Sequence, residues 1–217
     1  MNARDIVLQR IRTALADVPD AEVPEPAPPA DADRAYRRSH AEGELVELFA
    51  ERVADYRAHV VRVTAADAAR TVGELLGGRG VTSLVVPPGF PEALLPQEGS
   101  WRRLGDDGPL AVAELEAADA VVTTAAVGIA VTGTIVLDAG PGQGRRVLTL
   151  LPDYHLCVVR ADQIVGDVPD AIALLDPARP LTFVSGPSAT SDIELDRVEG
   201  VHGPRTLHVL IIAEEPA

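Results

Sequence analysis

The sequence predicts an α/β protein with a Rossmann-like, mainly parallel β-sheet flanked by helices. Helix and strand signals alternate between residues 42 and 86, which is typical of βαβ units. Later in the chain, residues 207–212 are apolar at five of six positions, a pattern that favours a strand buried on both faces. These two observations predict parallel strands in one sheet, with helices packed on each side.

An amphipathic helix is predicted over residues 3–18. Asn2 stands where it can cap the first turn, and four apolar residues recur at helical spacing, namely Val7, Ile11, Leu15 and Val18. An acidic, proline-rich segment, residues 19–39, follows and favours an extended linker. The helix is therefore an arm ahead of an α/β domain predicted for residues 40–217. Its apolar stripe packs either on that domain or on another subunit.

The α/β domain opens with alternating elements: a helix over residues 42–56, a strand over 59–63, a helix over 65–76 and a strand over 81–86. Thr64 is placed to cap the second of these helices, and Gly77 and Gly78 are placed to end it. Local signals therefore agree with the βαβ pattern.

Six further apolar runs have the length of strands, and they are residues 120–122, 129–137, 147–151, 156–159, 181–184 and 207–212. Between residues 138 and 147 the chain is too short for a crossover helix, which predicts an antiparallel hairpin appended to the sheet. The stretch from 120 to 137 has no charge, but its threonines and glycines favour buried strands joined by a turn over a membrane span.

The charge and cysteine content exclude several classes of function. The chain has 33 acidic and 19 basic residues and a formal net charge of −14, so nucleic acid and anionic lipid surfaces are poor partners. A small anionic metabolite could bind only at a local cluster of arginines or backbone N–H groups. Cys157 is the single cysteine, so this chain alone cannot build a disulfide, an iron–sulfur site or a four-cysteine zinc site. Its histidines lack metal-ligand spacing, and without a secretory segment we expect a cytoplasmic protein.

A glycine-rich run, residues 139–146, is the first candidate site. It departs from the phosphate-loop and dinucleotide-binding patterns, so a nucleotide is disfavoured. Two interpretations of this run stay open. Gly142 and Gly144 could take positive φ in a hairpin turn, or exposed N–H groups followed by Arg145 and its neighbour Arg146 could bind an anion.

A serine-rich loop, residues 185–194, is the second candidate, because it follows an apolar strand and ligands bind at the carboxyl ends of strands in open α/β sheets. Its ligand-binding candidates are Ser185, Gly186, Ser188 and Asp192. Ser191 and Glu194 form a capping-box pattern, and Glu194 is also a candidate acid or base.

The turn before the last strand adds two candidates, His202 and Arg205, if it closes on the serine-rich loop. Asp153 and His155 form a possible acid/base pair, since alternate residues of a strand face the same side.

Four segments carry a resemblance to a known family, and in order they are residues 132–138, 150–155, 185–194 and 201–205. They resemble the signature of the LUD-domain family of lactate-utilization proteins. The resemblance implies a fold similar to the NagB/RpiA/CoA-transferase group and a ligand-binding role for Thr132, Gly133 and Thr134. It also implies a role beside partner proteins, some with iron–sulfur clusters, in converting L-lactate to pyruvate, with no cofactor bound by this chain.

The sequence departs from the family pattern at two positions. Val131 stands where the family usually has Glu, and Ala189 stands where many relatives have Arg. We therefore predict a non-redox subunit or accessory protein of lactate oxidation that binds a small anionic ligand. The alternative is a stand-alone enzyme or binding protein for a small carboxylate, sugar-phosphate or CoA derivative. An assembly factor that docks through its arm is a third hypothesis, and a homo-oligomer stays open.

Overall fold

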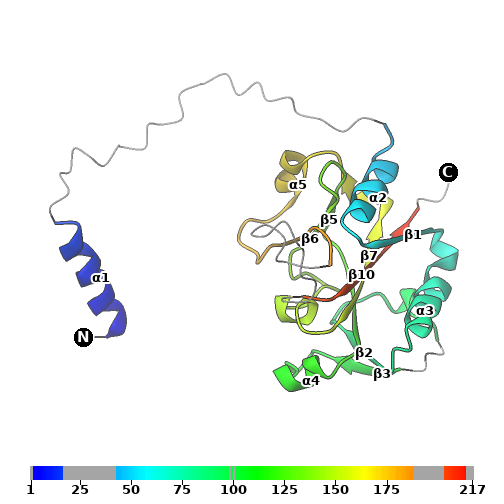
Figure 1. Ribbon diagram of the computed structural model, residues 1–217, viewed down its shortest axis with the longest axis horizontal. Coiled ribbons are helices and arrows are strands. Elements are labelled where there is room, and N and C mark those ends of the chain that lie inside the picture. The colour runs from blue at the N-terminus through cyan, green and yellow to red at the C-terminus, as the bar shows by residue number, and fades with distance from the viewer. Residues whose placement is uncertain (1, 17–42, 98, 100, 188–202, 214–217) are drawn as a thin grey trace. The chain divides into compact units, whose positions relative to one another are not determined.

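The computed structural model describes residues 2–16, 43–97, 99, 101–187 and 203–213. The chain divides into two units, Met1–Arg37 and Arg38–Ala217, and each is described on its own (Figure 1). Among these residues, no helix is both long enough and apolar enough to cross a membrane.

Helix α1 (Ala3–Ala14) forms within the segment predicted to be helical, and Val18 lies outside the described residues. The predicted cap is present, since Asn2 Oδ1 accepts a hydrogen bond from the Asp5 N–H at 2.9 Å. Asp5 Oδ2 in turn accepts one from the Asn2 N–H at 3.3 Å, which completes a capping box. No residue of α1 is buried within its unit, and its exposed apolar side chains include Ile6, Val7, Leu8 and Ile11.

The second unit is built on a six-stranded parallel sheet, which confirms the predicted fold class. Its strand order is β1-β10-β7-β4-β2-β3. The strands are β1 (His59–Val63), β2 (Ser83–Val86), β3 (Arg102–Gly105), β4 (Ala120–Thr124), β7 (Tyr154–Arg160) and β10 (Thr206–Ile212). Strand β3 was not predicted, because this edge strand buries only Leu104 of its four residues and so lacks an apolar run.

The two faces of this sheet are covered differently. On β7, Leu156 and Val158 belong to the cluster that packs under helix α3 (Ala68–Gly78), whereas Cys157 and Val159 face helix α2 (Leu45–Asp55) and the second sheet. This alternation follows from the two-residue period of a strand, and it explains why continuous apolar runs form buried parallel strands. Two short helices complete the unit, α4 (Val112–Glu116) and α5 (Val168–Leu174) (Figure 1).

A second, four-stranded sheet has the order β8-β5-β6-β9. Its strands are β5 (Val127–Ile129), β6 (Thr134–Leu137), β8 (Ile164–Val165) and β9 (Thr182–Val184). Strands β5 and β6 form an antiparallel hairpin, so an appended hairpin exists as predicted. Its position was wrong, because the turn lies at residues 130–133 and not between residues 138 and 147.

The predicted strand at residues 147–151 was also wrong. This segment holds the 3-10 helix η4 (Arg146–Thr149), in which Leu148 is fully buried while its neighbour Val147 is half-buried. A short apolar run fits either a strand or one turn of buried helix, and periodicity over so few residues does not separate them.

Helix α3 ends differently from the prediction. Gly77 and Gly78 lie in its last turn, and the left-handed position is at Gly80, with φ of 67°. Gly80 N–H donates to Gly77 C=O and Val81 N–H donates to Leu76 C=O, which is a Schellman motif. At the other end, Thr64 precedes a short 3-10 turn and bonds to the Asp67 carboxylate at 3.0 Å.

The order in which successive strands are added to the parallel sheet changes side between β2 and β4. These strands are neighbours, but β2 leads to β3 on one side while β4 leads toward β7 on the other. Such a switch point opens a crevice at the carboxyl ends of the strands in doubly wound sheets.

Candidate functional site

Three hydroxyl groups link two of the predicted site segments. Thr132 Oγ1 donates to Thr134 Oγ1 at 2.8 Å, and Thr134 Oγ1 lies 2.7 Å from Ser185 Oγ. The pairing of β6 with β9 produces this contact, because Ile135 is opposite Val184 and the next residues therefore meet. We call Thr132, Thr134 and Ser185 the hydroxyl ladder.

Two glycines hold the ladder against the end of helix α2. Gly133 has φ of 58°, and a Cβ there would lie 2.6 Å from the Arg52 carbonyl carbon. Gly186 has φ of 94°, and a Cβ there would lie 2.8 Å from the Tyr56 carbonyl oxygen. Both positions need glycine for its left-handed backbone and for the close approach of α2.

A small pocket, with a volume of about 90 Å³, adjoins Ser185. Its polar lining residues are Arg146, Thr149, His155, Thr182 and Ser185, and Gly186 and Gly203 also line it. A water molecule occupies about 30 Å³ of liquid, so the pocket suits a ligand of a few non-hydrogen atoms. We call this space the small pocket.

The small pocket does not lie where the sequence placed the ligand site. His155 and Leu207, which line it, are the second residues of β7 and β10, so it is beside the amino ends of these strands. The strand before Ser185 is β9, which pairs antiparallel to β6 in the second sheet. The expectation that this loop follows a parallel strand was therefore wrong.

Arg146 is the cationic residue of the small pocket. Among the described residues its side chain has no hydrogen-bond or ion-pair partner, and its carbonyl accepts a bond from Thr149 Oγ1 at 3.1 Å. The chain has a net charge of −14, so a guanidinium in a pocket with three hydroxyl side chains gives this place a local positive charge that favours an anion.

His155 is a neutral polar group on the same pocket. It is 1% exposed, and its Nε2 lies 2.7 Å from Thr123 Oγ1. Burial lowers the pKa of His155 to about 4, so the ring is uncharged at neutral pH. It can exchange a hydrogen bond with a ligand but adds no positive charge. Beneath it, burial raises the pKa of the Cys157 thiol to about 12, which keeps this cysteine unreactive.

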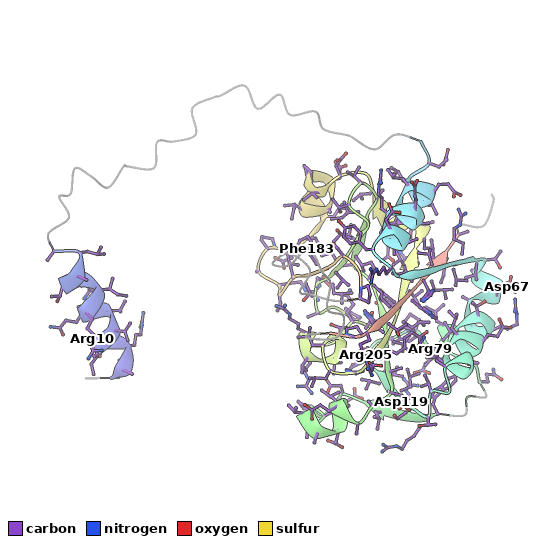
Figure 2. All side chains as sticks on the ribbon, in the orientation of Figure 1. Arg10, Asp67, Arg79, Asp119, Phe183 and Arg205 are labelled. Atoms are coloured by element: carbon purple, nitrogen blue, oxygen red, sulfur yellow. The ribbon has the colours of Figure 1, made fainter. Side chains whose placement is uncertain are left out.

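The predicted pairing of Asp153 with His155 was wrong. Asp153 receives both hydrogen bonds of an Arg205 ion pair, with Nη2 to Oδ2 at 3.0 Å, while His155 bonds to Thr123. The structure thus joins two predicted site residues, Asp153 and Arg205, at the exposed amino ends of β7 and β10. Arg205 is labelled in Figure 2.

Arg79, also labelled in Figure 2, lies near these strand ends. Its Nη2 donates to Thr206 Oγ1 at 2.9 Å, and its guanidinium carbon is 5.0 Å from the centre of the Tyr154 ring. The Tyr154 hydroxyl bonds to His208 Nδ1 at 2.8 Å on the face opposite the small pocket. This cluster is structural, because cation–π and hydrogen-bond contacts satisfy its groups.

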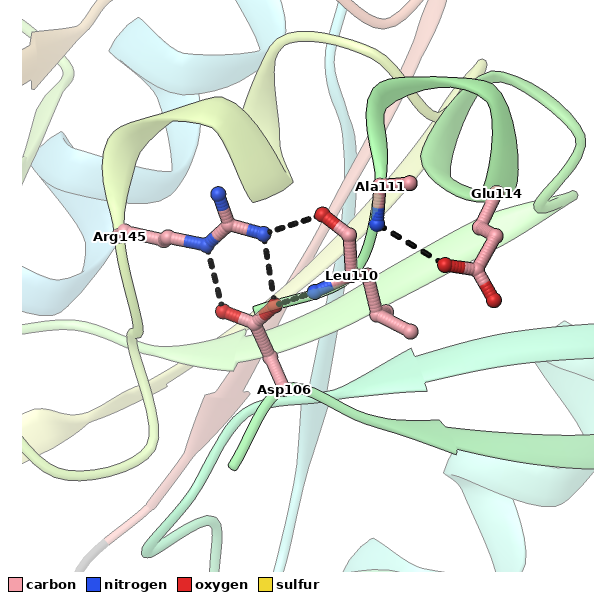
Figure 3. Close-up of polar contacts among 5 residues, drawn as sticks. All are labelled: Asp106, Leu110, Ala111, Glu114 and Arg145. Carbon is pink, nitrogen blue, oxygen red and sulfur yellow. Dashed lines mark hydrogen bonds and ion pairs between the residues drawn. The ribbon is translucent and has the colours of Figure 1, made fainter. Parts of the chain in front are cut away.

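Arg145 is not available for an anion, contrary to one reading of the glycine-rich run. Its Nε and Nη2 each donate to the Asp106 carboxylate at 2.8 Å, and Nη2 also donates to the Leu110 carbonyl (Figure 3). Hydrogen bonds from Arg145 lower the pKa of Asp106. Arg145 therefore fastens the glycine-rich run to the segment before α4.

The glycine-rich run is not a hairpin turn either, although both glycines have the expected positive φ, 75° at Gly142 and 67° at Gly144. Gly142 N–H donates to Pro88 C=O at 2.8 Å, and Thr124 N–H donates to Gly142 C=O at 2.9 Å. The run is thus hydrogen-bonded both to the segment that follows β2 and to the last residue of β4.

Four predicted site residues lie outside the described residues, and they are Ser188, Asp192, Glu194 and His202; Ala189 and Ser191 do as well. The prediction missed Thr149 and Thr123, whereas it named Arg146 together with Arg145 as an anion-binding candidate. Arg146 was visible as the second of two adjacent arginines, but nothing in the sequence showed which of the two is paired. In the described part of the chain, no three His, Cys, Asp or Glu residues are grouped to hold a metal ion.

The fold and pocket define a class of protein, a doubly wound α/β domain with an attached mixed sheet and a small pocket between the two. A family model for the LUD domain matches residues 46–212. The chain therefore belongs to the LUD-domain family.

Individual relatives agree with this assignment. Lactate utilization protein C of Deinococcus radiodurans is 43% identical over 216 residues, which cover 95% of this chain and 93% of that protein. Lactate utilization protein C of Bacillus subtilis is 30% identical over 129 residues, 55% of this chain and 53% of that protein. The crystal structure of a DUF162 family protein from Deinococcus radiodurans matches with a TM-score of 0.66 and 40% identity, covering 78% of this chain and 96% of that one.

Proposed function

We propose that this protein is a non-redox component of a cytoplasmic system that oxidises L-lactate to pyruvate, and that it binds a small carboxylate in the small pocket. The names of the relatives from Deinococcus radiodurans and Bacillus subtilis support the lactate part of this proposal. The observation that carries the binding part is that Arg146, which has no partner among the described residues, lines a pocket of about 90 Å³.

The chemistry of the pocket fits a 2-hydroxy or 2-oxo acid. The Arg146 guanidinium can hold a carboxylate through two parallel hydrogen bonds. The hydroxyls of Ser185 and Thr149 and the neutral His155 ring can exchange hydrogen bonds with a 2-hydroxyl or 2-oxo group. The hydroxyl ladder orients Ser185, because Thr134 Oγ1 occupies one side of its hydroxyl.

Electron transfer is assigned to partner proteins with iron–sulfur clusters. Such clusters are held by several cysteine thiolates, whereas this chain has only Cys157, which is fully buried in the core. The proposal gives this chain the binding of the acid and gives its partners the redox centres.

Calorimetric titration of the full chain with L-lactate and with pyruvate tests the binding. We expect Arg146→Gln to weaken the binding at least tenfold, because it removes a guanidinium that lines the pocket and has no partner among the described residues. Arg103→Gln is the matched control, since Arg103 is an arginine paired with Glu92 and does not line the small pocket. Binding that is equal in the wild type and Arg146→Gln, or absent from the wild type, would overturn the assignment.

A reconstituted lactate-oxidising system tests the role. Lactate-dependent reduction of an electron acceptor should fall when this chain is left out and return when it is added back. An unchanged rate without the chain contradicts the component role. Turnover of the acid by the isolated chain would instead favour the stand-alone enzyme.

A further inference from the structure

We infer that the crevice at the carboxyl ends of the parallel strands is a second ligand site, which takes an organic anion with an apolar body. The crevice has a volume of about 790 Å³, and the inference is independent of the small pocket and of its proposed function. Ligand sites of about 300–1,000 Å³ are typical for molecules of cofactor or drug size.

The crevice lies at the switch point of the sheet. It is lined by residues at or just beyond the ends of the strands, including Ala65 after β1, Gly89 after β2, Thr124 of β4, Arg160 of β7 and Ile212 of β10. In open α/β sheets this is the position where ligands bind. Of the individual residues predicted to bind a ligand or to act as acid or base, none is among its described lining residues, although Pro141 and Gln143 belong to the glycine-rich run.

The glycine-rich run forms one wall of the crevice through Pro141 and Gln143, together with Asp138 just before the run. This wall is fixed at two points, because Gly142 bonds to the ends of both β2 and β4. A Cβ at Gly89 would lie 2.9 Å from the Pro141 side chain, so the wall approaches the β2 end as closely as glycine permits. The wall is therefore a built surface, held in place by the main chain of the sheet.

Two ion pairs supply the charge of the crevice. Arg179 Nη1 lies 2.7 Å from Asp138 Oδ2, and Arg160 donates to Asp162 through Nε and Nη2, each at 2.9 Å. The remaining guanidinium nitrogens of both arginines have no hydrogen-bond partner among the described residues. The charges of these two arginines and two aspartates sum to zero. The crevice is therefore less negative than a chain with a net charge of −14 would be on average.

Gln143 is a buried polar side chain on the wall of the crevice. It is 5% exposed, and its Oε1 accepts the Asp138 N–H at 2.6 Å. Within the described residues its Nε2 makes no hydrogen bond. Buried polar groups are nearly always satisfied, so an amide N–H₂ left over on a cavity wall indicates an acceptor that binds there.

Donors therefore outnumber free acceptors in the crevice, since the carboxylates of Asp138 and Asp162 are already paired. The rest of the lining is largely apolar, with Leu94, Val127, Leu174 and Leu175 among its residues. The ligand that fits is an anion, a carboxylate or a phosphate ester, with its charge at Arg179 and Gln143 and its apolar part on these side chains.

Calorimetry with 2-naphthoate and with 2-naphthyl phosphate tests the site and separates the two anion types. Each probe has a rigid apolar body that is too large for the small pocket. We expect one molecule of at least one probe to bind per chain. Arg179→Gln should weaken it at least tenfold, and Gln143→Glu should weaken it at least fivefold, because a carboxylate there repels the anion.

Three controls keep the outcomes distinct. Arg103→Gln should bind the probe as the wild type does, and thermal melting checks that each variant is folded. Arg146→Gln should also keep probe binding, so a failure of the small pocket leaves this result untouched. The inference is overturned if neither probe binds to the wild type, or if folded Arg179→Gln keeps the wild-type affinity.

Discussion

Thr134 Oγ1 lies 2.7 Å from Ser185 Oγ, although 51 residues separate them in the chain. The contact joins the hairpin of the second sheet to the loop after β9, and it places Ser185 on the small pocket. Thr134 is 6% exposed, so its hydroxyl needs a partner inside the protein. Ser185 and Thr132 provide it.

A double-mutant cycle should detect this contact. We expect Thr134→Val and Ser185→Ala each to lower the free energy of unfolding, with a coupling energy of about 1 kcal/mol between them, the net value of a typical hydrogen bond. Urea unfolding of the wild type, both single variants and the double variant measures it. Strictly additive effects would contradict a direct bond.

Gly133 should not tolerate a side chain. Gly133→Ala forces a left-handed backbone on alanine, at about 1–2 kcal/mol, and brings its Cβ within 2.6 Å of the Arg52 carbonyl carbon. Gly77→Ala is the control, since Gly77 lies in α3 and a Cβ there meets nothing within 4 Å. We expect the control to raise stability by up to about 1 kcal/mol. Equal unfolding midpoints for the two variants would show that the close approach is absent.

Substituting the adjacent residues Arg145 and Arg146 one at a time should separate an effect on stability from an effect on ligand binding. Arg145→Gln leaves the largely buried Asp106 carboxylate without its bidentate partner, so we expect the melting temperature to fall by several degrees while the affinity for L-lactate is unchanged. Arg146→Gln should do the reverse. Melting curves and calorimetry on both variants check the contrast, and loss of lactate binding in Arg145→Gln would disprove it.

The buried His155 should make stability depend on pH in a defined window. Its pKa is about 4 in the folded protein, against 6.5 for a histidine in the unfolded chain, so the unfolded chain takes up the proton first as pH falls. The contribution of His155 to the free energy of unfolding is therefore complete above pH 6.5, and it is lost as the pH falls toward 4. Within this window His155 should add a slope of about 1.4 kcal/mol per pH unit to the free energy of unfolding.

Urea unfolding at several pH values between 5 and 6 measures this slope. His155→Gln keeps a group that can bond to Thr123 but removes the titration, so its slope should be smaller by that amount. His59→Gln removes an exposed histidine and should keep the contribution of His155. A slope that His155→Gln leaves unchanged would refute the buried neutral imidazole.

The parallel sheet could be predicted because buried parallel strands leave long apolar runs. Strands β4, β7 and β10 were found for this reason, whereas β3 was missed because three of its four residues are exposed. The second sheet was harder to predict. Its strands have two to four residues, and their partners are set by contacts between distant segments such as β6 and β9.

The candidate site was predicted in part. The segments around Thr134 and Ser185 do meet, and Asp153 does lie with Arg205. The sequence does not show which acidic residue each arginine is paired with. Arg145 and Arg146 are neighbours of the same type, and only the fold shows that one faces Asp106 and the other the small pocket.

The burial of Cys157 has a practical consequence. It is the single cysteine of the chain, it is fully buried, and its thiol pKa is raised to about 12, so maleimide reagents should leave the folded protein unlabelled. A cysteine introduced on the exposed surface of α1, for example Ala14→Cys, would then be the one reactive thiol. A spin label or fluorophore at that position would report on the N-terminal arm in the otherwise wild-type protein, with no background to subtract.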